Sequence, residues 1–227
     1  TMASPPLRTV KLFCSTVKWY LGVIAVAIII ITLNIASMFD TIWQAFHHAA
    51  FQVASIITTT GYSTTDFNLW PQASRTILVM LMFVGACAGS TGGGIKVSRF
   101  VILLKTVRKE LHQYLHPKSV KRIKMDGKPL DHDVVRNTNV FLITYVMIFA
   151  GSILLLAFDE LDLITNFTAV AATFNNIGPG LELVGPMSNF SVFSSPSKLV
   201  LIFDMLAGRL EIFPILLLFM KDTWKRF

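Results

Sequence analysis

The sequence predicts an all-α integral membrane protein that consists of two tandem helix–pore loop–helix repeats. Hydrophobic residues make up 53% of its 227 residues and charged residues only 15%, which lies outside the usual range of soluble domains. Two uninterrupted apolar stretches, residues 20–36 and 140–158, come close to the roughly 20 residues that cross a bilayer. The same order of shorter segments follows each stretch, so composition, spans and repetition all support this fold.

In the first repeat, an amphipathic run at 41–57 follows the span, and its length is typical of a re-entrant or buried helix. Asp40 stands directly before this run, where a carboxylate can serve as the helix N-cap. The run ends in the polar sequence TTTGYS. A later apolar stretch is interrupted by GSTGGGIK before it resumes at 97–104. Because lipid cannot bond to freed backbone groups, we expect this interruption to border protein or a water-filled path.

The second repeat has the same order of elements. After the span, a run at 163–174 follows Asp162, a second candidate N-cap, and ends in NNIGPG. The last apolar stretch, residues 199–220, contains three charged side chains: Asp204, Arg209 and Glu211. Charge within a membrane is costly unless partners or water receive it. We therefore expect this stretch, too, to border protein or water.

A shift of 117 residues relates the two repeats. It carries residues 18–38 onto 135–155, and it carries Thr59 onto Asn176, Gly61 onto Gly178 and Gly92 onto Arg209. Two divergent copies of one membrane unit are the simplest explanation. The predicted segments are an N-terminal cytoplasmic segment at 1–17, a first repeat at 18–106, a basic cytoplasmic connection at 107–134 and a second repeat at 135–227.

The distribution of charge predicts the orientation. Of twenty Lys and Arg residues, nine lie between residues 105 and 136, three precede the first span and three follow Met220. By the positive-inside rule, both termini and the central connection are cytoplasmic. The glycine loops then open to the outside, where an excess of acidic side chains would raise the local concentration of cations. We expect the basic residues to meet lipid headgroups or a cytoplasmic protein, and no nucleic acid.

The glycine loops have the composition of a cation filter. A re-entrant helix that ends in Thr-Thr-Thr-Gly-Tyr directs the negative end of its dipole into the membrane, and extended backbone carbonyls beyond it can replace the water shell of a cation. Glycine supplies backbone angles that a Cβ excludes. The first loop resembles the potassium-filter string Thr-Val-Gly-Tyr-Gly. The predicted filter residues are Thr59, Thr60, Gly61 and Tyr62 in the first loop, and Asn176, Ile177, Gly178 and Pro179 in the second.

Four segments resemble the Trk/Ktr/HKT superfamily of potassium transporters, in the pattern of the bacterial TrkH/KtrB pore subunits. They are TTTGYSTTDFNLWP, GACAGSTGGGIKVSRF, ATFNNIGPGLELVGP and GRLEIFPILLLF. The resemblance covers nearly the whole chain and matches the last two of four repeats that surround a potassium-channel-like pore. It implies potassium uptake across the cytoplasmic (inner) membrane, with potassium as the substrate, no enzymatic activity and no covalent cofactor.

The resemblance also implies an intramembrane gate below the filter. The gate residues are Gly89, Ser90, Thr91, Gly92, Gly93 and Gly94 in the interrupted span of the first repeat, and Arg209 in the second. Further implied partners are a second copy of the protein in a homodimer and cytoplasmic nucleotide-binding regulatory subunits. Family members have two earlier repeats, so we expect this chain to be the C-terminal half of such a protein. Assembly from separate halves is the alternative.

Each site has a structural alternative. TTTGY is also a common helix cap and turn, and the spacing of Gly85 and Gly89 is also that of a helix-packing face. The glycine segment is not a phosphate loop, because no Ser or Thr directly follows Lys96. Arg209 has Asp204 and Glu211 nearby as ion-pair partners, although neither lies at the favoured helical spacing of three or four.

Three functions remain open at the level of the sequence. The first is a potassium-uptake pore subunit. The second is a sodium-permeable or sodium-coupled transporter of the same fold. The third is a non-transporting membrane module that uses its glycines for helix packing. Competition between potassium and sodium distinguishes the first two, and any ion flux distinguishes both from the third.

Overall fold

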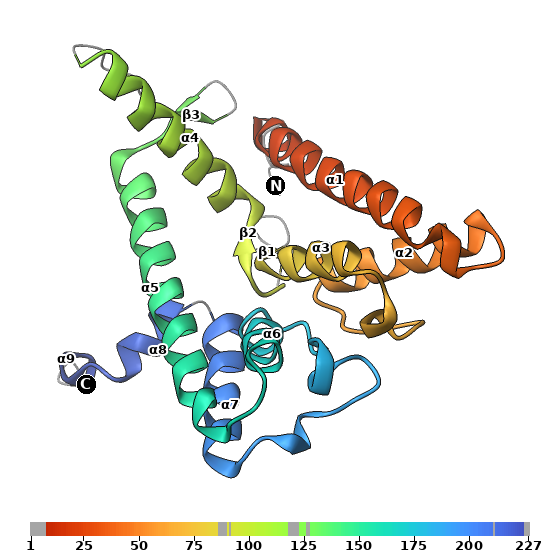
Figure 1. The fold of residues 1–227 in the computed structure, drawn as a ribbon. Helices are drawn as coiled ribbons and strands as arrows, with labels where there is room; N and C mark the ends of the chain where they lie inside the picture. The colour runs from red at the N-terminus through yellow and green to blue at the C-terminus, as the bar shows by residue number, and fades with distance from the viewer. Residues whose placement is uncertain are drawn as a thin grey trace, which may run out of the picture.

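The computed structural model of the protein describes residues 8–85, 90, 92–117, 123–125, 128–210 and 212–224. This part of the chain is mainly helical (Figure 1). Two of its helices, Thr16–Met38 and His132–Asp159, are long and apolar enough to cross a membrane, and they contain the two stretches predicted to span. The all-α class predicted from composition is therefore confirmed.

The first half begins with the long helix, turns back through a short one and ends in an interrupted helix pair (Figure 1). Its elements, with η for a 3-10 helix, are α1 (Arg8–Ile35), η1 (Ala36–Met38), α2 (Ile42–Ile57), η2 (Phe67–Leu69), α3 (Gln72–Phe83), β1 (Val84–Gly85), β2 (Ile95–Lys96) and α4 (Val97–Leu115). The two strands pair in parallel and bring the ends of the glycine segment together.

The second half repeats the order of long helix, short helix and interrupted helix. Its elements are β3 (Lys124–Met125), β4 (Lys128–Pro129), α5 (His132–Leu156), η3 (Ala157–Asp159), α6 (Leu163–Phe174), η4 (Glu182–Val184), η5 (Phe190–Val192), α7 (Ser195–Arg209), α8 (Ile212–Leu218) and α9 (Lys221–Trp224). In Figure 1, α1–α3 and α5–α7 form two groups, and β1, β2 and the start of α4 lie between them.

The two short helices begin at different kinds of cap. Asp162 caps α6 as predicted, since its carboxylate accepts from the N–H of Ile164 at 3.0 Å. Asp40 does not cap α2. The N-cap is Thr41, whose extended backbone precedes the first helical residue and whose hydroxyl accepts from the N–H of Gln44 at 3.3 Å. The helix therefore starts one residue later than it would with Asp40 as its N-cap.

The hydrophobic core joins the two halves. One buried cluster combines residues of α1, α2 and α3 with Phe67 and Trp70, and it also contains Ala171, Ile177 and Leu181 of the second half. Further clusters hold α5, α6 and α7 together. The outward faces of the two long helices stay apolar: Leu33 is 66% exposed and Met147 is 71% exposed. Such faces are expected of helices that contact lipid.

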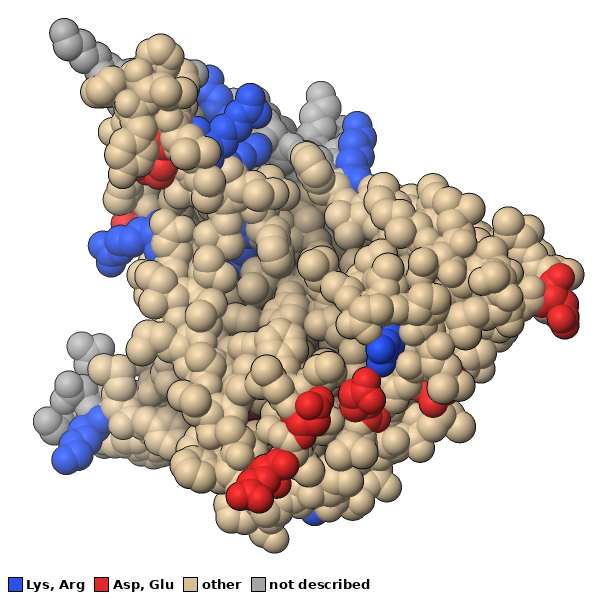
Figure 2. All heavy atoms as spheres, viewed as in Figure 1, with Lys and Arg blue, Asp and Glu red and all other residues tan. Residues whose placement is uncertain are grey.

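Charged side chains gather at opposite ends of the molecule (Figure 2). Many of the Lys and Arg residues lie toward the end formed by α4 and the β3–β4 region, whereas several Asp and Glu residues lie along the opposite edge. The carboxylate of Asp159, in η3, accepts a hydrogen bond from the N–H of Ser194 at 3.0 Å, which ties the end of the second long helix to the start of α7.

Candidate functional site

The first glycine loop leaves α2 through a set of backbone hydrogen bonds to the last turn of the helix. They are Thr58 N–H to Ala54 O (3.0 Å), Thr59 N–H to Ile56 O (3.1 Å), Thr60 N–H to Ser55 O (2.9 Å) and Gly61 N–H to Ser55 O (3.4 Å). Thr59 and Gly61 have positive φ angles, 57° and 79°. These left-handed residues turn the chain out of the helix, and glycine adopts such angles without a steric cost.

The second glycine loop has the same backbone conformation, 117 residues further on. Its bonds are Asn175 N–H to Ala171 O (3.2 Å), Asn176 N–H to Thr173 O (3.0 Å), Ile177 N–H to Ala172 O (2.8 Å) and Gly178 N–H to Ala172 O (3.5 Å). The positive φ angles recur at Asn176 (56°) and Gly178 (111°). Each bond of one loop therefore has its counterpart in the other, although the side chains differ.

The two loops contact each other. A Cβ added at Gly61 would overlap the carbonyl oxygen of Ile177 and lie 3.5 Å from the ring of Pro179. Gly61 is thus required twice, by its φ angle and by the neighbouring loop. A Cβ at Gly178 would meet nothing within 4 Å in the described chain. The second loop therefore occupies the flank of the first at Gly61, whereas the described chain leaves the flank of the second loop open at Gly178.

Side chains of α2 hold the outer part of the first loop. The hydroxyl of Ser55 donates to the carbonyl of Tyr62 at 2.5 Å, and the amide of Gln52 donates to the carbonyl of Thr65 at 3.3 Å. Tyr62 itself is 73% exposed. The Tyr62 carbonyl is therefore engaged by the helix, whereas Thr59, Thr60 and Gly61 form the turn itself.

The second loop is held by a different set of groups. The Tyr145 hydroxyl on α5 donates to the side-chain oxygen of Asn175 at 2.8 Å, and the Asn175 amide donates to the carbonyl of Ala171 at 2.8 Å. Further out, the N–H of Leu181 donates to the hydroxyl of Thr168 at 3.0 Å. Neither Tyr145 nor Thr168 was predicted as a site residue; a polar group within an apolar helix is the signal that marks each of them.

The glycine segment of the first repeat passes directly against the base of the second loop. A Cβ at Gly93 would overlap the carbonyl oxygen of Asn175, and one at Gly94, where φ is 75°, would lie 3.2 Å from the Asn175 side chain. Ser90 and Gly92 of this segment are also described, on either side of Thr91. Two of the predicted gate residues, Gly89 and Thr91, lie outside the described residues.

Arg209 is the last residue of α7, three residues before α8 begins at Ile212. The preceding Gly208 packs so closely on the second loop that a Cβ there would overlap the carbonyl oxygen of Phe174. The side chain of Asn176 also donates to the carbonyl of Met205 at 3.0 Å. The helix that bears Arg209 is therefore attached to the base of the second loop.

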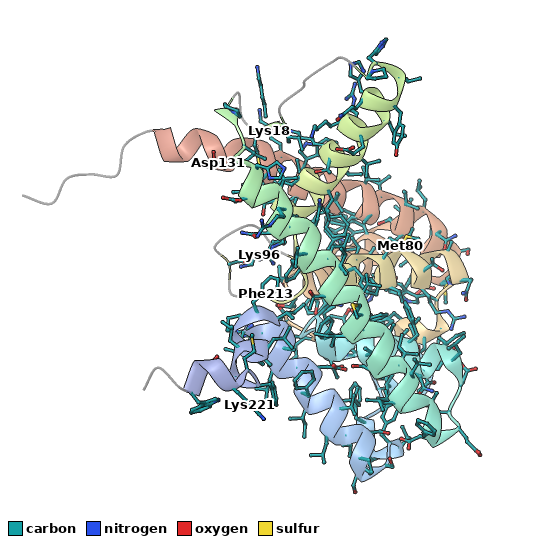
Figure 3. The ribbon with its side chains drawn as sticks, turned by 90° about the vertical axis from the view of Figure 1, so that its left-hand side faces the viewer. Lys18, Met80, Lys96, Asp131, Phe213 and Lys221 are labelled. Atoms are coloured by element: carbon teal, nitrogen blue, oxygen red, sulfur yellow. The ribbon has the colours of Figure 1, made fainter. Side chains whose placement is uncertain are left out.

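Arg209 and the glycine segment line one small cavity of about 60 Å³. Its described lining includes Ser90, Gly92, Gly94 and Arg209, together with Lys96 (labelled in Figure 3), Arg99, Tyr145 and Gly208. Both parts of the predicted gate thus meet beside the base of the second loop. The cavity is also rich in positive charge.

Asp204, a candidate ion-pair partner of Arg209, has a different partner in the structure. This carboxylate is fully buried and accepts a hydrogen bond from the Ser152 hydroxyl on α5 at 2.7 Å. Among the ion pairs of the described residues, Arg209 and Asp204 are not paired. Glu211 lies outside the described residues.

The 117-residue shift does not extend into the helices that follow the loops, α3 and α7. It carries the start of α3, Gln72, onto residue 189, but α7 starts at Ser195. The connection between loop and helix is therefore longer in the second repeat. Gly92 and Arg209 meet at the cavity because the helices pack together, and not because the repeats keep their register.

Groups of three or more metal-ligating side chains are not found among the described residues. The groups present at the site are backbone carbonyls, hydroxyls and a confined positive charge. Such an arrangement can bind a cation that has lost water and can oppose its passage.

Known proteins provide an independent comparison. A family model described as TrkH, cation transport protein, matches residues 7–225. The chain is 36% identical over 217 residues to the Trk system potassium uptake protein TrkH of Escherichia coli K12, covering 96% of this chain and 41% of that protein. The protein of the same name from Vibrio parahaemolyticus is 42% identical over 183 residues, covering 81% of this chain and 37% of that protein.

The fold agrees with the sequence match. The crystal structure of the potassium transporter TrkH from Vibrio parahaemolyticus superposes with a TM-score of 0.83 at 36% identity, over 92% of this chain and 45% of that chain. The chain therefore spans less than half the length of these relatives.

Proposed function

Because the chain belongs to the TrkH family of cation transport proteins, we propose that the protein containing it takes up potassium through a pore that this chain partly lines. The matched relatives are named as potassium uptake proteins, and the superposed structure as a potassium transporter. The proposal assigns no covalent chemistry and no covalent cofactor, with potassium as the substrate.

The observation that carries this proposal is the pair of matching loops. Two loops with one backbone conformation contact each other at Gly61 and Ile177. Each follows a short helix whose C-terminal dipole favours a cation. Carbonyls of Thr59, Thr60 and Gly61 in one loop, and of Asn176, Ile177 and Gly178 in the other, would replace the water of a potassium ion. Tyr62 and Pro179 complete the two strings.

Two loops surround only part of an axis. The open flank at Gly178 supports a further repeat at that position, in the way that the second loop occupies the flank of Gly61. The chain covers 41% of the Escherichia coli protein. We propose that the part it represents is the C-terminal half, because its loops resemble those of the last two repeats. The proposed segments remain residues 1–17, 18–106, 107–134 and 135–227.

The proposed gate consists of Gly89, Ser90, Thr91, Gly92, Gly93, Gly94 and Arg209. Its described members line one cavity against the base of the second loop. A fixed guanidinium at that place would repel a permeating cation, and the effect is strong in a confined, low-dielectric setting. Displacement of the glycine segment from Arg209 would then open the path.

The membrane arrangement follows from the charges. We propose a multi-pass protein of the cytoplasmic membrane, with the termini and the basic connection on the cytoplasmic side. The proposed partners are membrane lipid, a second protomer and a nucleotide-binding regulatory subunit on the basic side. The matched relatives are named as proteins of a Trk system, which supports a membrane complex, and the charge distribution supports a basic side for a further subunit.

The test compares the full-length protein that contains this chain with residues 1–227 alone, both purified and placed in lipid vesicles. We expect potassium uptake by the full-length protein, preferred over sodium in competition, and none by residues 1–227, because half a filter exposes carbonyls to lipid. Equal sodium flux would favour the sodium transporter. Absence of all ion flux in the full-length protein would favour the packing module, and robust flux from residues 1–227 would favour assembly of halves.

A further inference from the structure

Beyond the filter, one side chain of the first repeat binds the backbone of the second. The Asn68 amide donates to the carbonyl of Glu182 at 3.1 Å, and its oxygen accepts from the N–H of Glu182 at 3.0 Å. A single amide thus pairs with both polar backbone groups of one residue 114 positions away. Two hydrogen bonds of this kind determine orientation as well as distance.

Both partners are prepared for this contact. Asn68 lies in η2 between the buried Phe67 and Trp70, and its own N–H donates to the Asp66 carboxylate at 3.0 Å. Glu182 is a non-glycine residue with a positive φ of 52°, a conformation that usually requires outside support. Pairing of both its backbone groups with Asn68 supplies that support.

An ion pair reinforces the same junction. The Arg75 guanidinium, at the start of α3, donates to the Glu182 carboxylate at 2.8 Å and to the Gln72 side chain at 2.6 Å. The Arg75 side chain is only 22% exposed. Glu182 is therefore held through its backbone and its side chain, both times by the first repeat.

The junction lies just outside the proposed filter. Glu182 comes four residues after Gly178, and Asn68 comes seven residues after Gly61. The loops touch once at Gly61 and Ile177 and again at Asn68 and Glu182, so their spacing is constrained at both ends. The inner contact is close packing alone, whereas the outer contact is made by hydrogen bonds and an ion pair.

We propose that Asn68, Arg75 and Glu182 form an external clamp that maintains the spacing of the two filter loops and thereby the preference for potassium over sodium. This inference rests on the proposed function. The three residues act through the loops and do not touch the ion. They are positioning residues for selectivity.

The first test uses Asn68→Ala in the full-length protein, reconstituted in vesicles, with potassium and sodium in competition. We expect the potassium-to-sodium ratio to fall by about threefold to tenfold, because the loss of two hydrogen bonds frees Glu182. Asn189→Ala is the matched control. Asn189 is exposed, and the side-chain bond given for it within the described residues is local, from the N–H of Ser191 at 2.9 Å. The ion preference of Asn189→Ala should therefore stay at the wild-type value.

The second test exchanges the charges. Arg75→Glu and Glu182→Arg should each lower the ratio by about threefold, and the double variant should restore it to within about twofold of wild type. Asn68→Ala with lowered thermal stability but an unchanged ratio would overturn the clamp as a determinant of selectivity, as would a double variant no better than the single variants. A wild-type protein without potassium flux would instead overturn the proposed function, and the clamp with it.

Discussion

The two glycine loops have one backbone conformation and little sequence in common. In both, four consecutive N–H groups of the loop bond to the last carbonyls of a short helix. The second and fourth of these residues take positive φ angles, and they are Thr59 and Gly61 in the first loop and Asn176 and Gly178 in the second. The means of support differ. Ser55 and Gln52 of α2 bond to the first loop, whereas the second relies on Tyr145 and on a helix, α6, with nine of its twelve residues buried. Helix-end hydrogen bonds therefore determine the turn, and side chains decide how firmly it is held.

Below the loops the two repeats differ more. The first supplies the glycine-rich segment between β1 and β2, and the second supplies a charge, Arg209. Both lie against the second loop, through Gly93 and Gly208. The proposed gate needs unlike halves, one with a glycine segment and one with a charge, which would be a physical reason for the divergence of the repeats.

Substitution of the loop glycines should have the largest effect, and the size of this effect should differ between the two loops. Gly61→Ser places a Cβ on the Ile177 carbonyl and strains a positive φ, so we expect at least about a tenfold loss of potassium-to-sodium preference in the full-length protein. Gly178→Ser also strains a positive φ, but its Cβ meets no atom of the described chain within 4 Å. We therefore expect its potassium-to-sodium preference to fall by about fivefold or less. Flux competition in vesicles measures both.

The outcome also tests the surroundings of the second loop. If Gly178→Ser is as severe as Gly61→Ser, another part of the full-length protein occupies the flank of Gly178. If Gly61→Ser keeps the wild-type preference, the first loop does not form the filter. Gly151→Ser is a suitable control, since a Cβ there meets nothing within 4 Å.

Removal of the charge at the cavity should have the next largest effect. Arg209→Ala should raise potassium flux by roughly threefold to tenfold and leave the ion preference near wild type, because it removes a repulsive charge below the filter. Unidirectional potassium flux into vesicles measures this change. Arg108→Ala, on the exposed face of α4, is the control with an equal change in charge. Flux at or below wild type from a folded Arg209→Ala protein would identify Arg209 as a structural residue.

The smallest effect concerns the support of the first loop. Ser55→Ala removes the bond to the Tyr62 carbonyl and gives this helix the residue that the second repeat already has, Ala172. We expect at most about a fivefold loss of potassium preference, in keeping with one hydrogen bond. Ser191→Ala, on the exposed η5, serves as the control. A loss as large as that of Gly61→Ser would mean that side-chain support, and not the helix-end bonds, determines the turn.

Local patterns in the sequence determined much of this protein. Apolar runs predicted the long helices, and TTTGYS and NNIGPG marked the two loops, because helix ends and positive φ angles depend on a few adjacent residues. The 117-residue shift holds through Gly178 for the same reason. The N-cap of α2 was misplaced by one residue, since Asp and Thr both cap helices and only the start of the helix decides between them.

Tertiary structure alone decided what the loops touch. Gly61 meets Ile177, Asn68 meets Glu182, and Gly92 shares a cavity with Arg209, in each case across more than 100 residues. The register of the repeats even fails before Arg209, where a longer connection precedes α7. Such contacts arise from the packing of whole helices, whose relative positions depend on many weak interactions at once and leave no local pattern. For that reason the sequence identified the position of the loops, and the fold identified their neighbours.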